Sequence, residues 1–335
     1  MKHIEIPASY KSALSLRDTQ RAIKLTKDTV QVLLGAALNL DRVTAPVLVE
    51  ANSGINDDLT GVERKVVFSL KETNSDVEVV QSLAKWKRMA LAKYGYEVGE
   101  GIYTDMNAIR RDDDMDNLHS VFVDQWDWEK VISADQRTDA YLEDVVRRIV
   151  SSIVSTKQIV NKAYPALRTT LCENVTFITS EELRALYPDM SGHEREEAIV
   201  KKYRTVFIKQ IGAPLSDGKP HDNRAPDYDD WSLNGDLFFW DEVLQRPIEI
   251  SSMGIRVDAA SLAAQLKASG KEERMQYPYH QAVANGTLPL SIGGGIGQSR
   301  LCLLILEKAH VGEVQVSVWD EATKEACAKA GVSLL

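Results

Sequence analysis

The chain has 335 residues, of which 44% are hydrophobic and 27% are charged, and its formal net charge is −9 at pH 7. This length can bury a large core as one or two domains, and the acidic balance argues against a broad basic surface for nucleic acid. The N-terminus lacks the apolar core of a signal peptide, and the longest apolar-rich stretch, 30–40, is too short and too polar to span a bilayer. We therefore expect a cytoplasmic protein with no membrane or nucleic-acid partner. Cys172, Cys302 and Cys327 show no pairing or metal-binding pattern, and we interpret them as small hydrophobic residues.

The first long segment has the pattern of an amphipathic helix. Apolar residues recur every three or four positions over 16–38, and Ser15 followed by Asp18 predicts a capped start. The next segment, 43–49, is rich in β-branched residues but holds Pro46, so we expect a strand near a sheet edge or a subunit contact. A helix that leads into such a strand can pack against a second copy or lie within one subunit, and the spacing leaves both open.

The remaining elements alternate between strand-like and helix-like patterns. The expected strands are 65–70, 77–80, 101–109, 121–128, 175–179, 205–211, 237–240 and 247–257, and helices are expected after Ser82 and at 138–163, 181–186 and 193–203. Strands 101–109 and 121–128 are too close for a helical crossover and should pair antiparallel. No repeat or clear linker interrupts the chain, so we expect one α/β (α+β) domain over 1–335, with a mostly antiparallel sheet flanked by helices.

The segment 212–231 has the composition of a long loop, with three prolines, two glycines and five aspartates. Loops of this length inside compact domains are often functional lids. Composition alone also allows an exposed loop that has no function.

A glycine cluster, 291–297, leads through Arg300 into the apolar run 301–306. Gly293, Gly294 and Gly295 let a backbone approach a flat or phosphorylated ligand closely, and an arginine at a helix start suits a phosphate or a purine. Such a cluster serves equally well as a plain turn.

Two further clusters suggest a polar pocket. On strand 121–128 the side chains of Gln125 and Asp127 share one face, and buried polar groups need partners. Lys85 and Lys87 are two positions apart and cannot share a helical face, so we expect one to reach a site while the other stays in water.

A pair of acids, Asp236 and Glu249, falls on strands that we expect to be neighbours. Two such carboxylates can hold Mg²⁺ against nucleotide phosphates, because this ion takes few protein oxygens and keeps several waters. Two separate surface acids would give the same pattern.

Together these segments resemble the ammonia-dependent, AMP-forming asparagine synthetases, or aspartate–ammonia ligases. The matching strings are QSLAKWKR at 81–88, GEGIYTDMNAIR at 99–110, HSVFVDQWDWE at 119–129, SDGKPHDNRAPDYDDW at 216–231, LNGD at 233–236, SSMGIRVD at 251–258 and GGGIGQSRL at 293–301. That family is similar to the catalytic domain of class II aminoacyl-tRNA synthetases, which implies a homodimer built on the first helix and Pro46.

The resemblance also implies roles for individual residues. It assigns Arg110 and Arg300 to the ATP phosphates with the glycines at 293–295, and Asp236 and Glu249 to Mg²⁺. It assigns substrate binding to Asp57, Ser82, Lys87, Gln125, Arg224, Ser252 and Arg256, with Asp127 and Asp229 beside the reacting groups.

The implied reaction is the conversion of L-aspartate, ammonia and ATP to L-asparagine, AMP and pyrophosphate through a β-aspartyl-adenylate. Ammonia must attack as the neutral molecule, so a carboxylate that binds ammonium and accepts a proton would help. Asp57, Asp127 and Asp229 are candidates that the sequence does not rank, and one of them more naturally holds the substrate α-amino group. The loop around Arg224 can close over the intermediate.

Two other functions remain open from the sequence. A tRNA synthetase-like enzyme would share the adenylation step, but the chain leaves no obvious room for an anticodon-binding domain. A non-catalytic paralogue would be expected to have lost Arg110, Arg300 or the acids, all of which are present. Glutamine use is disfavoured because no cysteine follows Met1.

Overall fold

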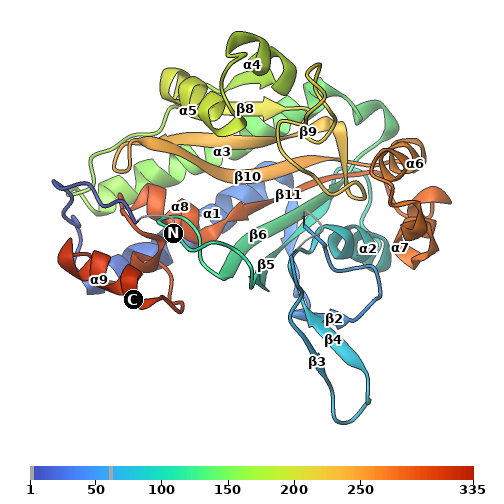
Figure 1. Ribbon diagram of the computed structural model, residues 1–335, viewed down its shortest axis with the longest axis horizontal. Coiled ribbons are helices and arrows are strands. Elements are labelled where there is room, and N and C mark those ends of the chain that lie inside the picture. The colour runs from blue at the N-terminus through green and yellow to red at the C-terminus, as the bar shows by residue number, and fades with distance from the viewer. Residues whose placement is uncertain (1–3, 60–62) are drawn as a thin grey trace.

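The computed structural model describes residues 4–59 and 63–335 of the chain. Its centre is an eight-stranded sheet, drawn in Figure 1. Its strands lie side by side in the order β1 (Leu40–Arg42), β5 (Gly101–Ile109), β6 (Phe122–Val131), β11 (Ser291–Gly297), β10 (Arg246–Arg256), β9 (Asp229–Asp241), β8 (Thr205–Lys209) and β7 (Thr176–Thr179). All neighbours from β5 to β8 run antiparallel, whereas β1–β5 and β7–β8 are parallel. The expected mostly antiparallel sheet and the β5–β6 hairpin are therefore confirmed.

Helices flank this sheet, and a small second sheet projects from the body in Figure 1. The small sheet has the order β2 (Leu48–Glu50), β4 (Asp76–Val79) and β3 (Val67–Ser69). The helices are α1 (Leu16–Leu38), α2 (Ala84–Tyr94), α3 (Asp139–Ala163), α4 (Ser180–Leu186), α5 (Gly192–Tyr203), α6 (Ala259–Ala268), α7 (Pro278–Ala284), α8 (Gln298–Ile305) and α9 (Glu321–Lys329), with short 3₁₀ turns η1 (Ala134–Gln136), η2 (Glu272–Gln276) and η3 (Val311–Glu313). None of the helices within the described ranges is long and apolar enough to cross a membrane.

The two long helices pack together and cover one face of the sheet. The expected helix 16–38 is confirmed, and its start is capped as predicted, because the Ser15 hydroxyl accepts a hydrogen bond from the Asp18 backbone N–H at 3.1 Å. Leu34 and Leu38 of α1 are buried in the main core with Ile149 of α3. Burial of these apolar stripes is the main force that holds both helices against the sheet.

Two expectations need correction. The segment 43–49 is not one strand: β1 ends at Arg42 and β2 begins at Leu48, since Pro46 lacks the N–H that a sheet ladder needs. The predicted loop is three residues shorter at its C-terminal end, because β9 already begins at Asp229. The glycine cluster, for which a turn was one alternative, is a central β-strand.

We expect Leu34→Ala to lower the free energy of unfolding by about 2–5 kcal/mol, because it opens a cavity between α1 and the core. Lys24→Ala, on the exposed face of the same helix, removes a surface ion pair with Asp28 and should change stability by less than about 1 kcal/mol. Urea unfolding of both variants measures the difference. Equal losses would show that α1 does not depend on its buried face.

Candidate active site

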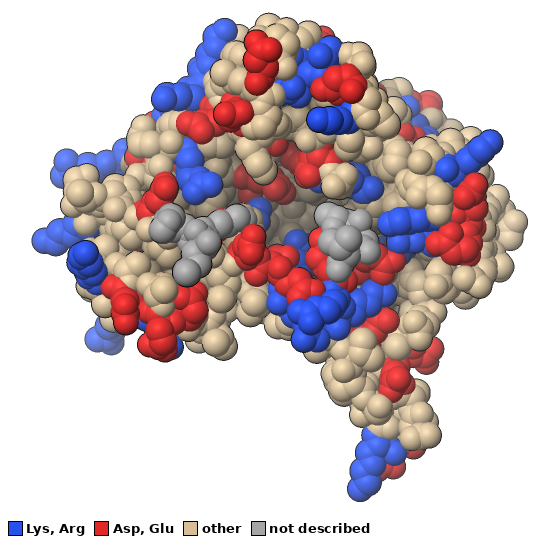
Figure 2. All heavy atoms as spheres, viewed as in Figure 1, with Lys and Arg blue, Asp and Glu red and all other residues tan. Residues whose placement is uncertain are grey.

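A pocket of about 320 Å³ opens where β6, β10 and β11 meet α2, α8 and the loop before β9. Figure 2 shows acidic and basic side chains gathered around a hollow in the middle of this face. Fourteen of the predicted site residues line it: Asp57, Ser82, Lys87, Arg110, Gln125, Asp127, Arg224, Asp229, Glu249, Ser252, Arg256, Gly294, Gly295 and Arg300. Asp236 and Gly293 lie directly behind the wall, against Arg224 and against Glu129, respectively. The sequence thus predicted residues that the fold brings together, although they come from all parts of the chain.

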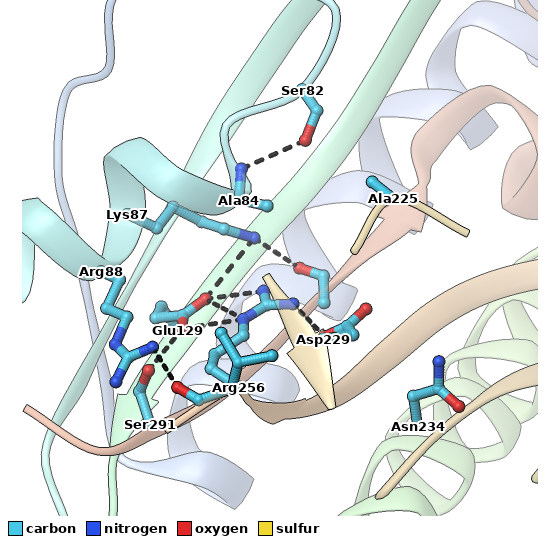
Figure 3. Close-up of polar contacts among 12 residues, drawn as sticks. Ser82, Ala84, Lys87, Arg88, Glu129, Ala225, Asp229, Asn234, Arg256 and Ser291 are labelled. Atoms are coloured by element: carbon cyan, nitrogen blue, oxygen red, sulfur yellow. Dashed lines mark hydrogen bonds and ion pairs between the residues drawn. The ribbon is translucent and has the colours of Figure 1, made fainter. Parts of the chain in front are cut away.

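Arg256 at the end of β10 is the centre of a buried charge cluster. Its Nε and Nη2 donate to the two Glu129 carboxylate oxygens at 2.9 and 2.7 Å, and its Nη1 pairs with Asp229. The Ser291 hydroxyl donates to the same Glu129 carboxylate at 2.7 Å. Figure 3 shows these groups converging on Glu129 from neighbouring strands. The fork of the guanidinium suits two acids at once, so the side chain of Arg256 is held in one orientation.

Lys87 of α2 completes the cluster from the opposite side. Its ammonium pairs with Asp127, lies 4.0 Å from Glu129, and donates to the Gly294 carbonyl oxygen at 2.9 Å. Burial lowers the pKa of Lys87, although the charge of Asp127 opposes that shift. The expectation that Lys85 stays in water is wrong. Its side chain is 2% exposed and its Nζ lies 3.3 Å from Asp227, because the segment before β9 that carries Asp227 lies against the start of α2.

The acids of this cluster respond to burial in different ways. Burial alone would raise the pKa of Glu129, but the charges of Arg256 and Lys87 and its hydrogen bonds hold that pKa below its ordinary value. Burial raises the pKa of Asp229, and its pairing with Arg256 only partly offsets the shift. Asp127 Oδ2 is buried and has no hydrogen-bond partner among the described residues. The cluster therefore offers two fixed cations and an unused acceptor to a small ligand with charges of both signs.

The glycines of β11 explain why this cluster can form. A Cβ on Gly293 would meet the Glu129 carboxylate and the Arg256 guanidinium, and a Cβ on Gly295 would meet the Gln125 amide. Glycine weakens an ordinary strand, but here it lets side chains of the neighbouring strands lie over the backbone.

Two arginines stand on other walls of the pocket. Arg110 follows β5 directly, and its Nε and Nη2 both donate to the Gln81 carbonyl oxygen at 3.3 Å. Arg300 lies in the first turn of α8, where its Nη1 donates to the Glu249 carbonyl oxygen at 3.2 Å. In the part of the chain that the structure describes, neither guanidinium forms a close ion pair with an acid. The Glu249 carboxylate lies 3.7 Å from Arg300. Both remain able to bind an anion.

Asp236 of β9 and Glu249 of β10 lie on adjacent strands, as predicted. Asp236 pairs with Arg224, while its Oδ1 is buried without a partner in the described residues. Burial raises the pKa of Asp236 to about 7, and the Glu249 charge adds to this shift while Arg224 opposes it. This excess of negative charge fits a divalent cation such as Mg²⁺, which needs only one or two carboxylates. No group of three His, Cys, Asp or Glu side chains within 4–59 and 63–335 is arranged for a metal.

Asp57 approaches the pocket from the loop after β2. It is 2% exposed, and its Oδ1 accepts a hydrogen bond from the Leu59 backbone N–H at 3.1 Å. Burial raises its pKa, as does the charge of Asp227, against the opposing charges of Lys85 and Arg110. Unlike Asp127 and Asp229, it forms no ion pair with any residue that the structure describes.

Several residues of the site were not predicted from the sequence. Glu129 shares the face of β6 with Gln125 and Asp127, so extending the period-two pattern by one step would have found it. His119 also lines the pocket, and its Nδ1 lies 2.8 Å from Asp116. Nothing in the local sequence pattern distinguishes this histidine from a surface residue.

We expect Glu129→Gln to destabilise the fold by about 3 kcal/mol at pH 7, because it leaves buried cations without an acid. The pKa of Glu129 is lower in the folded chain than its ordinary 4.5, so its stabilisation is present above that pH and is lost as the pH falls through the lowered value. The difference between variant and wild type should therefore shrink on acidification. Urea unfolding at pH 7 and at about pH 4 measures it, and a pH-independent difference would contradict the assignment.

Comparison with known proteins shows which family this chain belongs to. The family model described as aspartate–ammonia ligase matches residues 17–331. Aspartate–ammonia ligases of Clostridium tetani and Levilactobacillus brevis are 51% and 52% identical to this chain, over 98% and 99% of it and over 97% and 100% of their own lengths.

Solved structures support the fold independently. Asparaginyl-tRNA synthetases of Entamoeba histolytica and Pyrococcus horikoshii, both in complex with asparaginyl-adenylate, superpose on 89% of this chain with a TM-score of 0.61. They are 15% and 16% identical to it, and the match spans 66% and 68% of their lengths. The fold is thus that of the class II synthetases, and the chain belongs to the aspartate–ammonia ligase family.

Proposed function

We propose that this chain is a ligase that converts L-aspartate, ammonia and ATP into L-asparagine, AMP and pyrophosphate through a β-aspartyl-adenylate. The observation that carries the proposal is one pocket that joins a buried receptor for a small zwitterion, Lys87 and Arg256 with their acids, to Arg110 and Arg300. A carboxylate resists amidation because its leaving group would be oxide. Its conversion to a mixed anhydride with AMP supplies a better leaving group.

In the first half-reaction, Lys87 and Arg256 bind the α-carboxylate of aspartate, and Ser82, Gln125 and Ser252 line the space around the rest of the molecule. The β-carboxylate is then free to point toward Arg110 and Arg300. Attack on the α-phosphorus builds negative charge on phosphate oxygens, and fixed guanidinium groups stabilise that charge. The glycines of β11, whose central members Gly294 and Gly295 line the pocket, leave room for the nucleotide.

Mg²⁺ would be held by Asp236 and Glu249. When bound there, it would supply charge neutralisation for the phosphates of ATP. Arg224, which pairs with Asp236, lies in the loop before β9 and lines the same pocket.

In the second half-reaction, Asp57 binds ammonium and accepts its proton. One observation favours it over Asp127 and Asp229: it has no ion-pair partner in the described part of the chain, whereas both of the others do. Like them it lines the pocket, and burial raises its pKa toward that of a usable base, as it does for Asp229. Asp127 and Asp229 are committed to Lys87 and Arg256, and the free Oδ2 of Asp127 suits the substrate α-amino group.

We also propose a cytoplasmic homodimer built on one domain, with α1 and the segment around Pro46 at the subunit contact. Val32 on α1 is 69% exposed, and Val47 and Leu48 after Pro46 are 52% and 37% exposed. The proposed contact would cover these exposed apolar side chains.

The test of the function is an incubation with ATP, Mg²⁺ and aspartate, supplemented in turn with ammonia, glutamine or tRNA. Asparagine and AMP are expected with ammonia alone. Charged tRNA without free asparagine would favour a synthetase-like enzyme, and no product would favour a non-catalytic paralogue.

We expect Arg110→Ala and Arg300→Ala each to lower the rate of AMP formation by about a hundredfold or more, because each removes a fixed charge from the transition state. Sedimentation of both variants should match that of the wild type. Retained activity would contradict the assignment of Arg110 and Arg300 to the ATP phosphates.

Lys87→Ala should chiefly weaken aspartate binding, since it deletes one of the two cations of the receptor. The apparent KM for aspartate is expected to rise by about tenfold or more while the KM for ATP stays near the wild-type value. An unchanged KM for aspartate would show that Lys87 is a structural cation only.

A further inference from the structure

Asp57 lies in a segment that has no regular secondary structure to fix its position. Residues 51–59 contain no helix or strand, so the position of the Asp57 carboxylate depends on side-chain contacts of its neighbours. Asn56 is bound on one side: its Nδ2 donates to Glu78 Oε2 at 3.0 Å, and its Oδ1 accepts from the Gln81 backbone N–H at 2.8 Å. Asp58 provides the anchor on the other side: its Oδ1 pairs with Lys65 at 2.9 Å, seven positions along the chain, and its Oδ2 is anchored to a distant part of it.

Arg274 of η2 supplies that anchor from 216 positions along the chain. Its Nη2 donates to Asp58 Oδ2 at 2.6 Å, and its Nη1 donates to Asp227 Oδ2 at 2.7 Å. The Arg274 side chain is 8% exposed, and it does not line the pocket. A guanidinium can grip two carboxylates at once because its donors are fixed in one plane.

Asp227 is the fixed point of this arrangement. Its Oδ2 also lies 3.3 Å from Lys85 Nζ and 2.9 Å from His280 Nε2, so contacts from α2, η2 and α7 meet on one oxygen that is fully buried. Burial alone would raise its pKa, but Lys85, His280 and Arg274 lower it strongly, so Asp227 stays ionised. With Lys85 and His280 in place, Asp227 keeps partners even without Arg274.

We propose that Arg274 is a positioning residue for the ammonia step, which holds Asp57 against the substrate by tying Asp58 to Asp227. This inference rests on the proposed function, in which Asp57 binds ammonium. The groups assigned to adenylation depend on other supports, because Arg256 belongs to a sheet strand, and Lys87 and Arg300 belong to α2 and α8. Loss of the tether should therefore impair the second half-reaction and spare the first.

The two half-reactions can be measured separately. Aspartate-dependent exchange of labelled pyrophosphate into ATP, without ammonia, reports adenylation, and asparagine formation against ammonium concentration reports the second step. For Arg274→Met we expect exchange within about twofold of wild type and an apparent KM for ammonium raised by about tenfold to a hundredfold, as for a displaced catalytic group.

Arg274→Lys keeps the positive charge but replaces the planar guanidinium with a single ammonium. It serves as the test of the inference if Arg274→Met does not fold. A single ammonium cannot grip both acids in the same geometry, so we expect a smaller rise in the KM for ammonium, again with normal exchange. Asp58→Ala should raise the KM for ammonium at least as much as Arg274→Met, since it also removes the pair with Lys65. The double variant should be no worse than Asp58→Ala alone, because Arg274 acts on Asp57 only through Asp58.

Arg195→Met is the matched control. Arg195 of α5 is as buried as Arg274, at 7% exposure, but its Nε donates to the Tyr187 carbonyl oxygen at the end of α4, and neither residue lines the pocket. It should lower stability without changing the KM for ammonium. Exchange and amidation that fall in parallel in Arg274→Lys, or an unchanged KM for ammonium, would overturn the inference. If the wild type itself makes no asparagine from ammonia, the proposed function fails instead.

Discussion

The ion pairs of Arg256 with Glu129 and Asp229 are the constraint on which the site depends. Burying unpaired charges costs several kcal/mol for each ion, so these groups are tolerated only where strands β6, β10 and the start of β9 are held in register. The strand between β6 and β10 must then be built from glycine, since side chains on Gly293 would occupy the space of the ion pair. The glycine cluster is thus explained by the cluster of charges that lies above it.

This arrangement divides the pocket into a rigid part and a tethered part. The proposed aspartate receptor stands on α2 and at the end of β10, as Figure 3 shows for Lys87 and Arg256. The cations proposed for ATP, Arg110 and Arg300, lie directly after β5 and in the first turn of α8. Asp57 and Arg224 come from loops: Arg274 pairs with Asp58 next to Asp57, and Asp236 pairs with Arg224. A fixed receptor with adjustable loops suits a two-step reaction, because adenylate must form before ammonia is admitted and must be shielded from water meanwhile.

The sequence predicted those parts of the structure that local patterns determine. Apolar periodicity and the Ser15 cap gave α1, and the alternation in β6 gave Gln125 and Asp127 as pocket residues. Roles such as those of Lys87 and Arg256 came from the resemblance to a family, because spacing alone does not distinguish a receptor from a surface charge.

The parts that could not be predicted depend on contacts distant in sequence. Nothing in the sequence around Lys85 distinguishes it from an exposed lysine. Its burial depends on Asp227, which only the fold brings next to it. The contact of Arg274 with Asp58 spans most of the chain and leaves no periodic signal. The sequence left the glycine cluster open between a ligand-binding segment and a plain turn and did not predict a strand, because glycine has little preference of its own and the neighbouring strands decide.

The central claim is that this pocket brings the β-carboxylate of aspartate against the α-phosphate of ATP. Transfer of oxygen from aspartate labelled with ¹⁸O in its β-carboxylate tests the claim directly. Mass spectrometry of the products formed with ammonia should find one labelled oxygen in AMP and none in pyrophosphate. Label in inorganic phosphate, or unlabelled AMP, would contradict the account.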